Sequence, residues 1–151
     1  MEGKRDFTKV AKKLRADQKN YKKAFQRHSD SYEKYTDASK SSRYLLLCYC
    51  VECGLKCLVM KNNKLYKVEN ANEEVKKVLG THDIRALLNE VKQAGKYSFF
   101  HINTEYGDVV SIAQYHQMCR YGINSEEKDR EKEKENIKTL ENIMNWLKEE
   151  I

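Results

Sequence analysis

The sequence contains no proline and only six glycines, and no glycine lies between Gly3 and Gly54. Proline and glycine interrupt helices and populate tight turns, so their scarcity argues against a sheet fold with many turns. Lys, Glu, Leu and Tyr are instead abundant, which favours helices. A chain of 151 residues is the size of one domain with a substantial core. We therefore expect a single all-α domain over residues 1–151, with about five main helices and a short connector helix.

The sequence also lacks a long hydrophobic run. The longest uninterrupted apolar stretch, Tyr44–Val51, has eight residues, whereas a membrane-spanning helix needs about 20. The opening residues MEGKRDF contain no apolar segment of the kind found in secretory signals. We therefore expect a soluble, cytoplasmic protein that does not associate with a membrane.

Cysteine is present in an odd number, and four of the five cysteines fall in one short apolar segment. This distribution favours reduced core thiols over a disulfide framework. Cys50 and Cys53 form a CxxC pair, but a structural zinc site needs a second such pair or a histidine pair at ligand spacing. The sequence has neither, so we expect no metal and no cofactor. The five residues are Cys48, Cys50, Cys53, Cys57 and Cys119.

The densest apolar segment is Arg43–Met60, with the sequence RYLLLCYCVECGLKCLVM. A helix that is apolar on nearly every face is buried by its neighbours, so we expect this segment to be the central helix of the bundle. Glu52 and Lys56 lie four residues apart with the acid first, the favourable order for a helical ion pair. They are expected to form a structural polar pair. Gly54 is expected to permit the close approach of another helix.

Residues 7–35 show a helical period with an aromatic face, which predicts one long amphipathic helix or two consecutive helices. An aromatic stripe at this spacing either stacks on nucleic-acid bases or packs in the core, and we favour the core. The stripe consists of Phe7, Leu14, Tyr21, His28 and Tyr35, with a second row of Ala11, Phe25 and Tyr32.

Three further helices are predicted along the middle of the chain. Residues 72–80 predict a short capped helix. Thr81, His82 and Asp83 open a second helix, for which Gly95 marks the stop. Phe99 and Phe100 are expected to add to the core. Asp108 is then predicted to cap a third helix, which ends at Gly122.

Ser125 is predicted to cap the last helix. The first part of this helix, residues 126–136, has no apolar residue and is expected to project into solvent or to line a polar interface. Its second part carries a heptad-like apolar seam that either closes the bundle or pairs with a second copy of the chain. The seam consists of Ile137, Leu140, Met144, Leu147 and Ile151.

The positive charge is concentrated at the start of the chain. Residues 1–43 carry 13 Lys and Arg against 6 Asp and Glu, whereas residues 44–151 carry 16 against 17. This pattern suits contact with a polyanion, RNA or DNA first; the alternative is a solvated helix face that is rich in lysine. The candidate RNA-binding residues are Lys12, Lys13, Arg15, Lys19, Lys22, Lys23 and Arg27.

Familiar catalytic motifs are absent: there is no glycine-rich phosphate loop, no GxSxG and no HExxH. Spaced short motifs nevertheless resemble the HEPN superfamily, in particular small prokaryotic members with an ECGLK central helix. The resemblance covers about residues 20–150, and the basic segment 1–19, predicted to be helical, is additional to it. The motifs are YKKAFQRH at 21–28, ECGLK at 52–56, HDIRALL at 82–88 and Arg120-Tyr121.

The resemblance implies an antiparallel helical bundle that forms a homodimer. Catalytic HEPN members are metal-independent endoribonucleases with an Arg-x(4–6)-His motif near the start of the last helix. Here no histidine follows Arg120, and general acid–base catalysis is worth about 10²–10⁴-fold. His116, one turn earlier, is the candidate substitute, and Asn124 acting with a water is another. We favour the alternative in which His116 packs in the core and Arg120 pairs with a carboxylate such as Glu52.

Two functions remain open from the sequence. The resemblance implies an RNA-associated protein of a prokaryotic toxin–antitoxin or antiphage system, acting as a non-standard metal-independent endoribonuclease. Its partners would then be RNA, an antitoxin or other protein, and a second copy of the chain. The alternative is a non-catalytic HEPN dimerisation or adaptor module that binds a protein partner.

Overall fold

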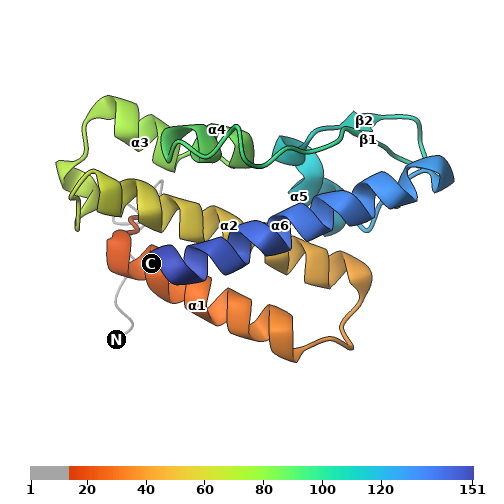
Figure 1. The fold of residues 1–151 in the computed structure, drawn as a ribbon, viewed down its shortest axis with the longest axis horizontal. Helices are drawn as coiled ribbons and strands as arrows, with labels where there is room; N and C mark the ends of the chain where they lie inside the picture. The colour runs from red at the N-terminus through yellow and green to blue at the C-terminus, as the bar shows by residue number, and fades with distance from the viewer. Residues whose placement is uncertain (1–13) are drawn as a thin grey trace, which may run out of the picture.

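The computed structural model describes residues 14–151 and confirms the predicted all-α bundle (Figure 1). Within these residues there are six α-helices, one two-stranded hairpin and two short 3₁₀ turns. The 3₁₀ turns are Val68–Asn70 and Glu127–Asp129. The helices are α1 (Gln18–Lys34), α2 (Lys40–Asn62), α3 (Glu73–Leu79), α4 (Ile84–Glu90), α5 (Ile112–Arg120) and α6 (Arg130–Glu150), and the strands are β1 (Ile102–Asn103) and β2 (Val109–Val110).

Helix α2 is the central element, as predicted, and α1, α4, α5 and α6 pack around it (Figure 1). Ser39 caps its start by accepting a hydrogen bond from the Ser42 amide. Gly54 of α2 faces side chains of both α1 and α6: a Cβ atom there would be 2.7 Å from Leu147 Cδ1 and 2.8 Å from Phe25 Cδ2. Within residues 14–151 no helix is long and apolar enough to cross a membrane.

Helix α1 is shorter than the prediction for residues 7–35, because residues 14–17 are not helical. Asp17 ends the extended segment: its amide donates to Asn20 Oδ1 at 2.9 Å, and its carboxylate accepts from the Val68 amide at 2.9 Å. The buried row of α1 is Phe25, Ser29 and Tyr32. Leu14 and Tyr35, predicted on the inner stripe, are exposed. The rest of the predicted segment, including Phe7 and Ala11, lies outside the described residues.

The hairpin replaces the predicted start of the helix before Gly122. Val109 and Val110 pair with Asn103 and Ile102 in an antiparallel ladder, and α5 begins only after Ser111. Asp108 therefore does not cap a helix. Its amide donates instead to Thr104 Oγ1, which holds the hairpin turn.

The last helix also begins later than predicted. Ser125 forms a β-bridge with Thr104, and a 3₁₀ turn precedes α6. Most residues of the polar stretch 126–136 are exposed, as the solvent alternative expects. Asp129, Glu133 and Asn136 are buried and make polar contacts inside the molecule, as the interface alternative expects. The apolar seam closes the bundle: Ile137, Leu140, Met144 and Leu147 are buried, and Ile151 is partly covered. Phe100, which was predicted to add to the core, is exposed.

Candidate functional site

Polar side chains from three separate elements meet beside the central helix. Helix α2 contributes Tyr49, Glu52 and Lys56, the turn before α4 contributes His82, and α5 contributes His116 and Arg120. We call these six residues the histidine cluster. The ring centroids of His82 and His116 are 5.4 Å apart, and those of Tyr49 and His116 are 6.5 Å apart.

Glu52 is the charged centre of this cluster. Its carboxylate accepts from Lys56 Nζ at 3.1 Å, as the predicted polar pair requires, and its second oxygen lies 2.9 Å from His82 Nδ1. The His82 side chain is 62% exposed, whereas the Glu52 side chain is largely covered. Because the carboxylate accepts the proton of Nδ1, Nε2 of His82 is left for another partner.

His116 is nearly enclosed, with 8% of its surface exposed. Burial lowers the pKa of His116, and the neighbouring His82 and Arg120 lower it further. A histidine whose pKa lies below its ordinary value is neutral at pH 7 and has a free lone pair. His116 can therefore accept a proton.

Arg120 is exposed and does not pair with Glu52, contrary to the pairing that the sequence favoured. Its Nη2 donates to the Tyr49 hydroxyl at 2.7 Å, and this hydrogen bond is the first cause that raises the pKa of Arg120. The Glu52 carboxylate is instead shared by Lys56 and His82. A guanidinium has five N–H donors, so the side chain keeps most of them for an external anion.

Asn124 takes a different position from the other proposed catalytic residues. Its backbone pairs with Glu105: the Asn124 amide donates to the Glu105 carboxylate at 2.7 Å, and the Asn124 carbonyl accepts from the Glu105 amide at 2.9 Å. These bonds hold Asn124 against the hairpin turn. No contact that the structure gives for residues 14–151 brings it to His116.

His82 belongs to the histidine cluster, although the sequence did not identify it as a candidate site residue. It was predicted only as a helix-start residue beside Asp83, which does cap α4 by accepting from the Arg85 amide at 3.0 Å. The only local signal was the HDIRALL motif at 82–88. Its partner Glu52 lies 30 residues earlier, and a sequence pattern does not show that contact.

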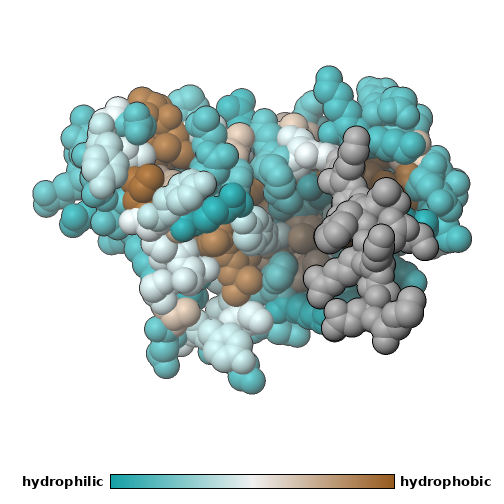
Figure 2. Space-filling view, turned by 180° about the vertical axis from the view of Figure 1, so that it is seen from behind, coloured by the Kyte–Doolittle hydropathy of each residue, from teal (hydrophilic) through white to brown (hydrophobic). Residues whose placement is uncertain are grey.

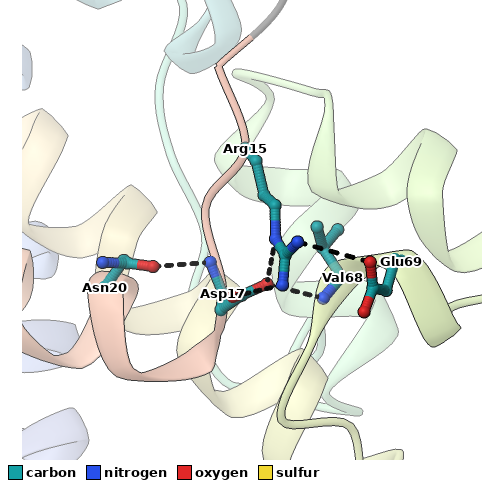
Figure 3. A network of polar contacts seen from close by, with 5 residues as sticks. All are labelled: Arg15, Asp17, Asn20, Val68 and Glu69. Carbon is teal, nitrogen blue, oxygen red and sulfur yellow. Dashed lines mark hydrogen bonds and ion pairs between the residues drawn. The ribbon is translucent and has the colours of Figure 1, made fainter.

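The candidate RNA-binding residues fall into three sets: Arg15 before α1, four residues within α1, and two outside the described residues. Figure 3 shows Arg15 between two carboxylates, with Asp17 at 3.1 Å and Glu69 at 3.3 Å, so it joins the start of α1 to the segment after α2 rather than offering a free charge. Lys12 and Lys13 lie outside the described residues. Within residues 14–151, no ion pair forms to the other four, which are exposed: Lys19, Lys22, Lys23 and Arg27.

The cysteines are not suited to act as nucleophiles at pH 7. All five are free thiols, and burial raises the pKa of Cys50 to about 12 and those of Cys53 and Cys119 to about 11. A thiol with such a pKa is protonated at pH 7 and is a poor nucleophile. Among residues 14–151 no group of three His, Cys, Asp or Glu side chains is placed to hold a metal ion.

The chemistry available at this site is therefore that of two imidazoles, one guanidinium and one carboxylate, close together on α2, α5 and the turn before α4. Such a set can transfer protons and bind an anion. Comparison with models of known protein families, with curated proteins and with solved structures finds no match for this chain.

Proposed function

We propose that this chain is an RNA-associated protein that cleaves single-stranded RNA at the histidine cluster without a metal ion. One observation carries the proposal: the rings of His82 and His116 lie 5.4 Å apart, and Arg120 is the next helical turn from His116. Metal-independent cleavage needs a base for the ribose 2′-hydroxyl, an acid for the leaving oxygen and a cation for the phosphate. The cluster holds one group for each task.

The roles follow from burial and hydrogen bonding. His116 takes the proton of the 2′-hydroxyl, whose oxygen then forms the new bond to phosphorus. His82 Nε2 gives a proton to the 5′-oxygen as its bond to phosphorus breaks, leaving a 2′,3′-cyclic phosphate and a 5′-hydroxyl. Glu52 orients the His82 ring through its contact with Nδ1, and Arg120 binds the non-bridging phosphate oxygens.

The exposed basic side chains of α1 would supply further phosphate contacts. Four such contacts to a single strand give a slope of about −3 in log affinity against log salt concentration. The affinity for RNA should therefore fall steeply between low and physiological salt.

The HEPN resemblance supports the biological setting of this proposal. On that basis we place the chain in a prokaryotic toxin–antitoxin or antiphage system, as a homodimer in which Arg120 and His116 of both copies face one groove. An antitoxin or other protein partner would then control its activity. In the usual Arg-x(4–6)-His motif the histidine follows the arginine. In this chain we propose that His116, which precedes Arg120, takes its place.

One observation favours a second function. His116 is only 8% exposed, which restricts access of a 2′-hydroxyl to its ring. A non-catalytic HEPN dimerisation or adaptor module, in which the same polar contacts hold α2 and α5 together, accounts for that burial.

The test is cleavage of a labelled single-stranded RNA by the purified chain in the presence of EDTA. We expect a product that ends in a 2′,3′-cyclic phosphate, and we expect Arg120→Ala to abolish it. Arg130→Ala, which changes an exposed arginine at the start of α6, is the matched control and should cleave normally. Full activity of Arg120→Ala would refute the proposed site. RNA binding without any cleavage would favour the accessory role.

A further inference from the structure

A hollow of about 390 Å³ lies between the hairpin and α5. Its sides carry the exposed amides of Gln114 and Gln117 and the phenol of Tyr121, which is 70% exposed. Val109 and Met118 add apolar surface. Apolar residues also reach the surface near this end of the molecule (Figure 2). The hollow thus combines an aromatic ring, apolar walls and amides that both donate and accept hydrogen bonds.

This hollow adjoins the histidine cluster. Successive residues of an α-helix are about 100° apart, so Gln114 and Gln117 lie near one another on α5, and Tyr121 directly follows Arg120, the last residue of that helix. After the Tyr49 hydroxyl, the phenol of Tyr121 also contributes to the raised pKa of Arg120, so that phenol lies beside the guanidinium. A ligand bound through Arg120 therefore has the hollow next to it.

The walls of the hollow are held in place by the hairpin turn. Thr104 is buried, and its hydroxyl oxygen accepts from the Tyr106 amide at 3.2 Å and from the Asp108 amide at 3.3 Å. The Ile123 amide donates to the Met118 carbonyl at 3.0 Å, which fixes the other side. The hollow is therefore formed before any ligand arrives, as small-molecule sites usually are.

Charge decides which part of an RNA strand can enter. Asp108 also lines the hollow, and a carboxylate there repels a phosphate but accepts from the amino group of a base. Proteins that read single-stranded RNA stack unpaired bases on aromatic side chains and bond their edges. The hollow offers Tyr121 for stacking, and the glutamine amides with Asp108 for edge contacts.

We propose that this hollow binds an unstacked base of the nucleotide whose phosphate is held by Arg120. Tyr121 stacks on the base, and Gln114 and Gln117 bond its edge. The inference rests on the proposed function, because it takes RNA as the ligand and Arg120 as the phosphate-binding residue. It makes the hollow the determinant of base preference at the cleavage site.

The experiment measures the affinity of the full chain for two labelled probes of equal length, a 2′-O-methyl oligocytidylate and an abasic 2′-O-methyl ribose-phosphate oligomer. Neither probe can be cleaved, because the 2′-hydroxyl that would attack the phosphate is blocked. Both probes carry the same phosphates, so the ratio of their affinities measures what the bases contribute to binding. We expect the wild type to bind the oligocytidylate about 10-fold more tightly or better, since stacking on one aromatic side chain is worth this much. Tyr121→Ala should lose this ratio, whereas Tyr121→Phe should keep it.

Tyr106→Ala is the matched control, because Tyr106 is an exposed tyrosine of the hairpin turn that is not among the residues of the hollow. Its affinity ratio should equal that of the wild type. Equal affinity of the wild type for both probes, or a ratio that survives in Tyr121→Ala, would overturn the base site and leave RNA association intact. No binding of either probe at low salt would overturn the proposed function as well.

Discussion

Two polar clusters lie on different sides of α5, and neighbouring residues of that helix, Tyr115 and His116, each contact one of them. Tyr115 faces the first, in which the carboxylate of Glu133 accepts from the hydroxyl of Tyr115 at 2.5 Å, the hydroxyl of Ser125 at 2.9 Å and Lys40 Nζ at 2.9 Å. We call this the Glu133 network. His116 faces the second, the histidine cluster.

The two clusters differ in how their charges are satisfied. In the Glu133 network the carboxylate is 4% exposed and has three donors from α2, α5 and the loop before α6. In the histidine cluster, His82 and Arg120 are exposed, and each has one identified partner and further hydrogen-bonding capacity. A buried charge with all its partners stabilises a fold, whereas polar groups with free capacity at the surface can act on a ligand.

The largest effect is expected in the histidine cluster. His82→Gln removes the proposed acid, so the rate of RNA cleavage should fall about 10²–10⁴-fold, with little change in thermal stability because the side chain is mostly exposed. The measurement is single-turnover cleavage of labelled RNA, with His101→Gln as the control at an exposed histidine. An unchanged rate would show that His82 is not the acid.

The next largest effect is expected in the Glu133 network. Glu133→Ala leaves the hydroxyls of Tyr115 and Ser125 without their buried acceptor, and an unsatisfied buried hydrogen-bonding group costs about 1–3 kcal/mol of the free energy of unfolding. Urea denaturation measures it. Glu131→Ala, on the same turn of α6 but exposed and paired only with Lys134, should cost less than about 0.5 kcal/mol. Equal effects of the two variants would mean that the network adds no stability.

A smaller effect separates the two tyrosines that face these clusters. Tyr115→Phe removes one hydrogen bond to the buried Glu133 and should cost about 1–2 kcal/mol of stability. Tyr49→Phe removes the hydroxyl that accepts from the exposed Arg120 and should leave stability within about 0.5 kcal/mol. Thermal and urea unfolding of both variants measure the difference. A Tyr49→Phe loss as large as that of Tyr115→Phe would make the histidine cluster structural.

The smallest effect is the pH dependence of stability. Burial, His82 and Arg120 hold the pKa of His116 below its ordinary value of 6.5, so the unfolded chain binds this proton more readily than the folded chain. The stabilising contribution is complete above about pH 6.5 and is lost as the pH falls through the folded pKa. Urea denaturation at a series of pH values measures the free energy of unfolding. His116→Gln should remove the fall in this free energy that begins below about pH 6.5.

The Glu133 network responds at lower pH. Burial raises the pKa of Glu133, but the hydrogen bonds from Tyr115, Lys40 and Ser125 outweigh it and leave the pKa below its ordinary value of 4.5. Its contribution is therefore present above about pH 4.5 and is lost as the pH falls further. His116→Gln should keep this second loss, and a variant that loses both would contradict the separation of the two clusters.

Patterns within one helix were predicted well, because they depend on residues three or four positions apart. The apolar segment around Leu47 and Leu55 identified α2, and Ser39, Asn72 and Asp83 cap their helices as such residues do. The hairpin was missed, since Val109 and Val110 fit an apolar helical face as readily as a strand. Their pairing with β1 depends on Thr104 and the turn that it holds.

Contacts between distant residues were not predicted. Residues 126–136 contain no apolar side chain, and the two expectations for them, a solvated face or a polar interface, followed directly from that composition. Glu133 is nevertheless buried, because Lys40 and Tyr115 arrive from other elements and supply its donors. Sequence periodicity describes one element at a time and does not show which element will lie opposite.

The sequence by itself determined the all-α class, the buried central helix, the Glu52–Lys56 pair and the basic start of the chain, because each depends on local spacing or on composition. The tertiary structure alone decided that His82 meets Glu52 and His116, that Arg120 bonds Tyr49 rather than a carboxylate, and that Glu133 is enclosed. Those outcomes depend on which helices cross and where, and the free energy of a charge is set by the groups that the crossing places around it.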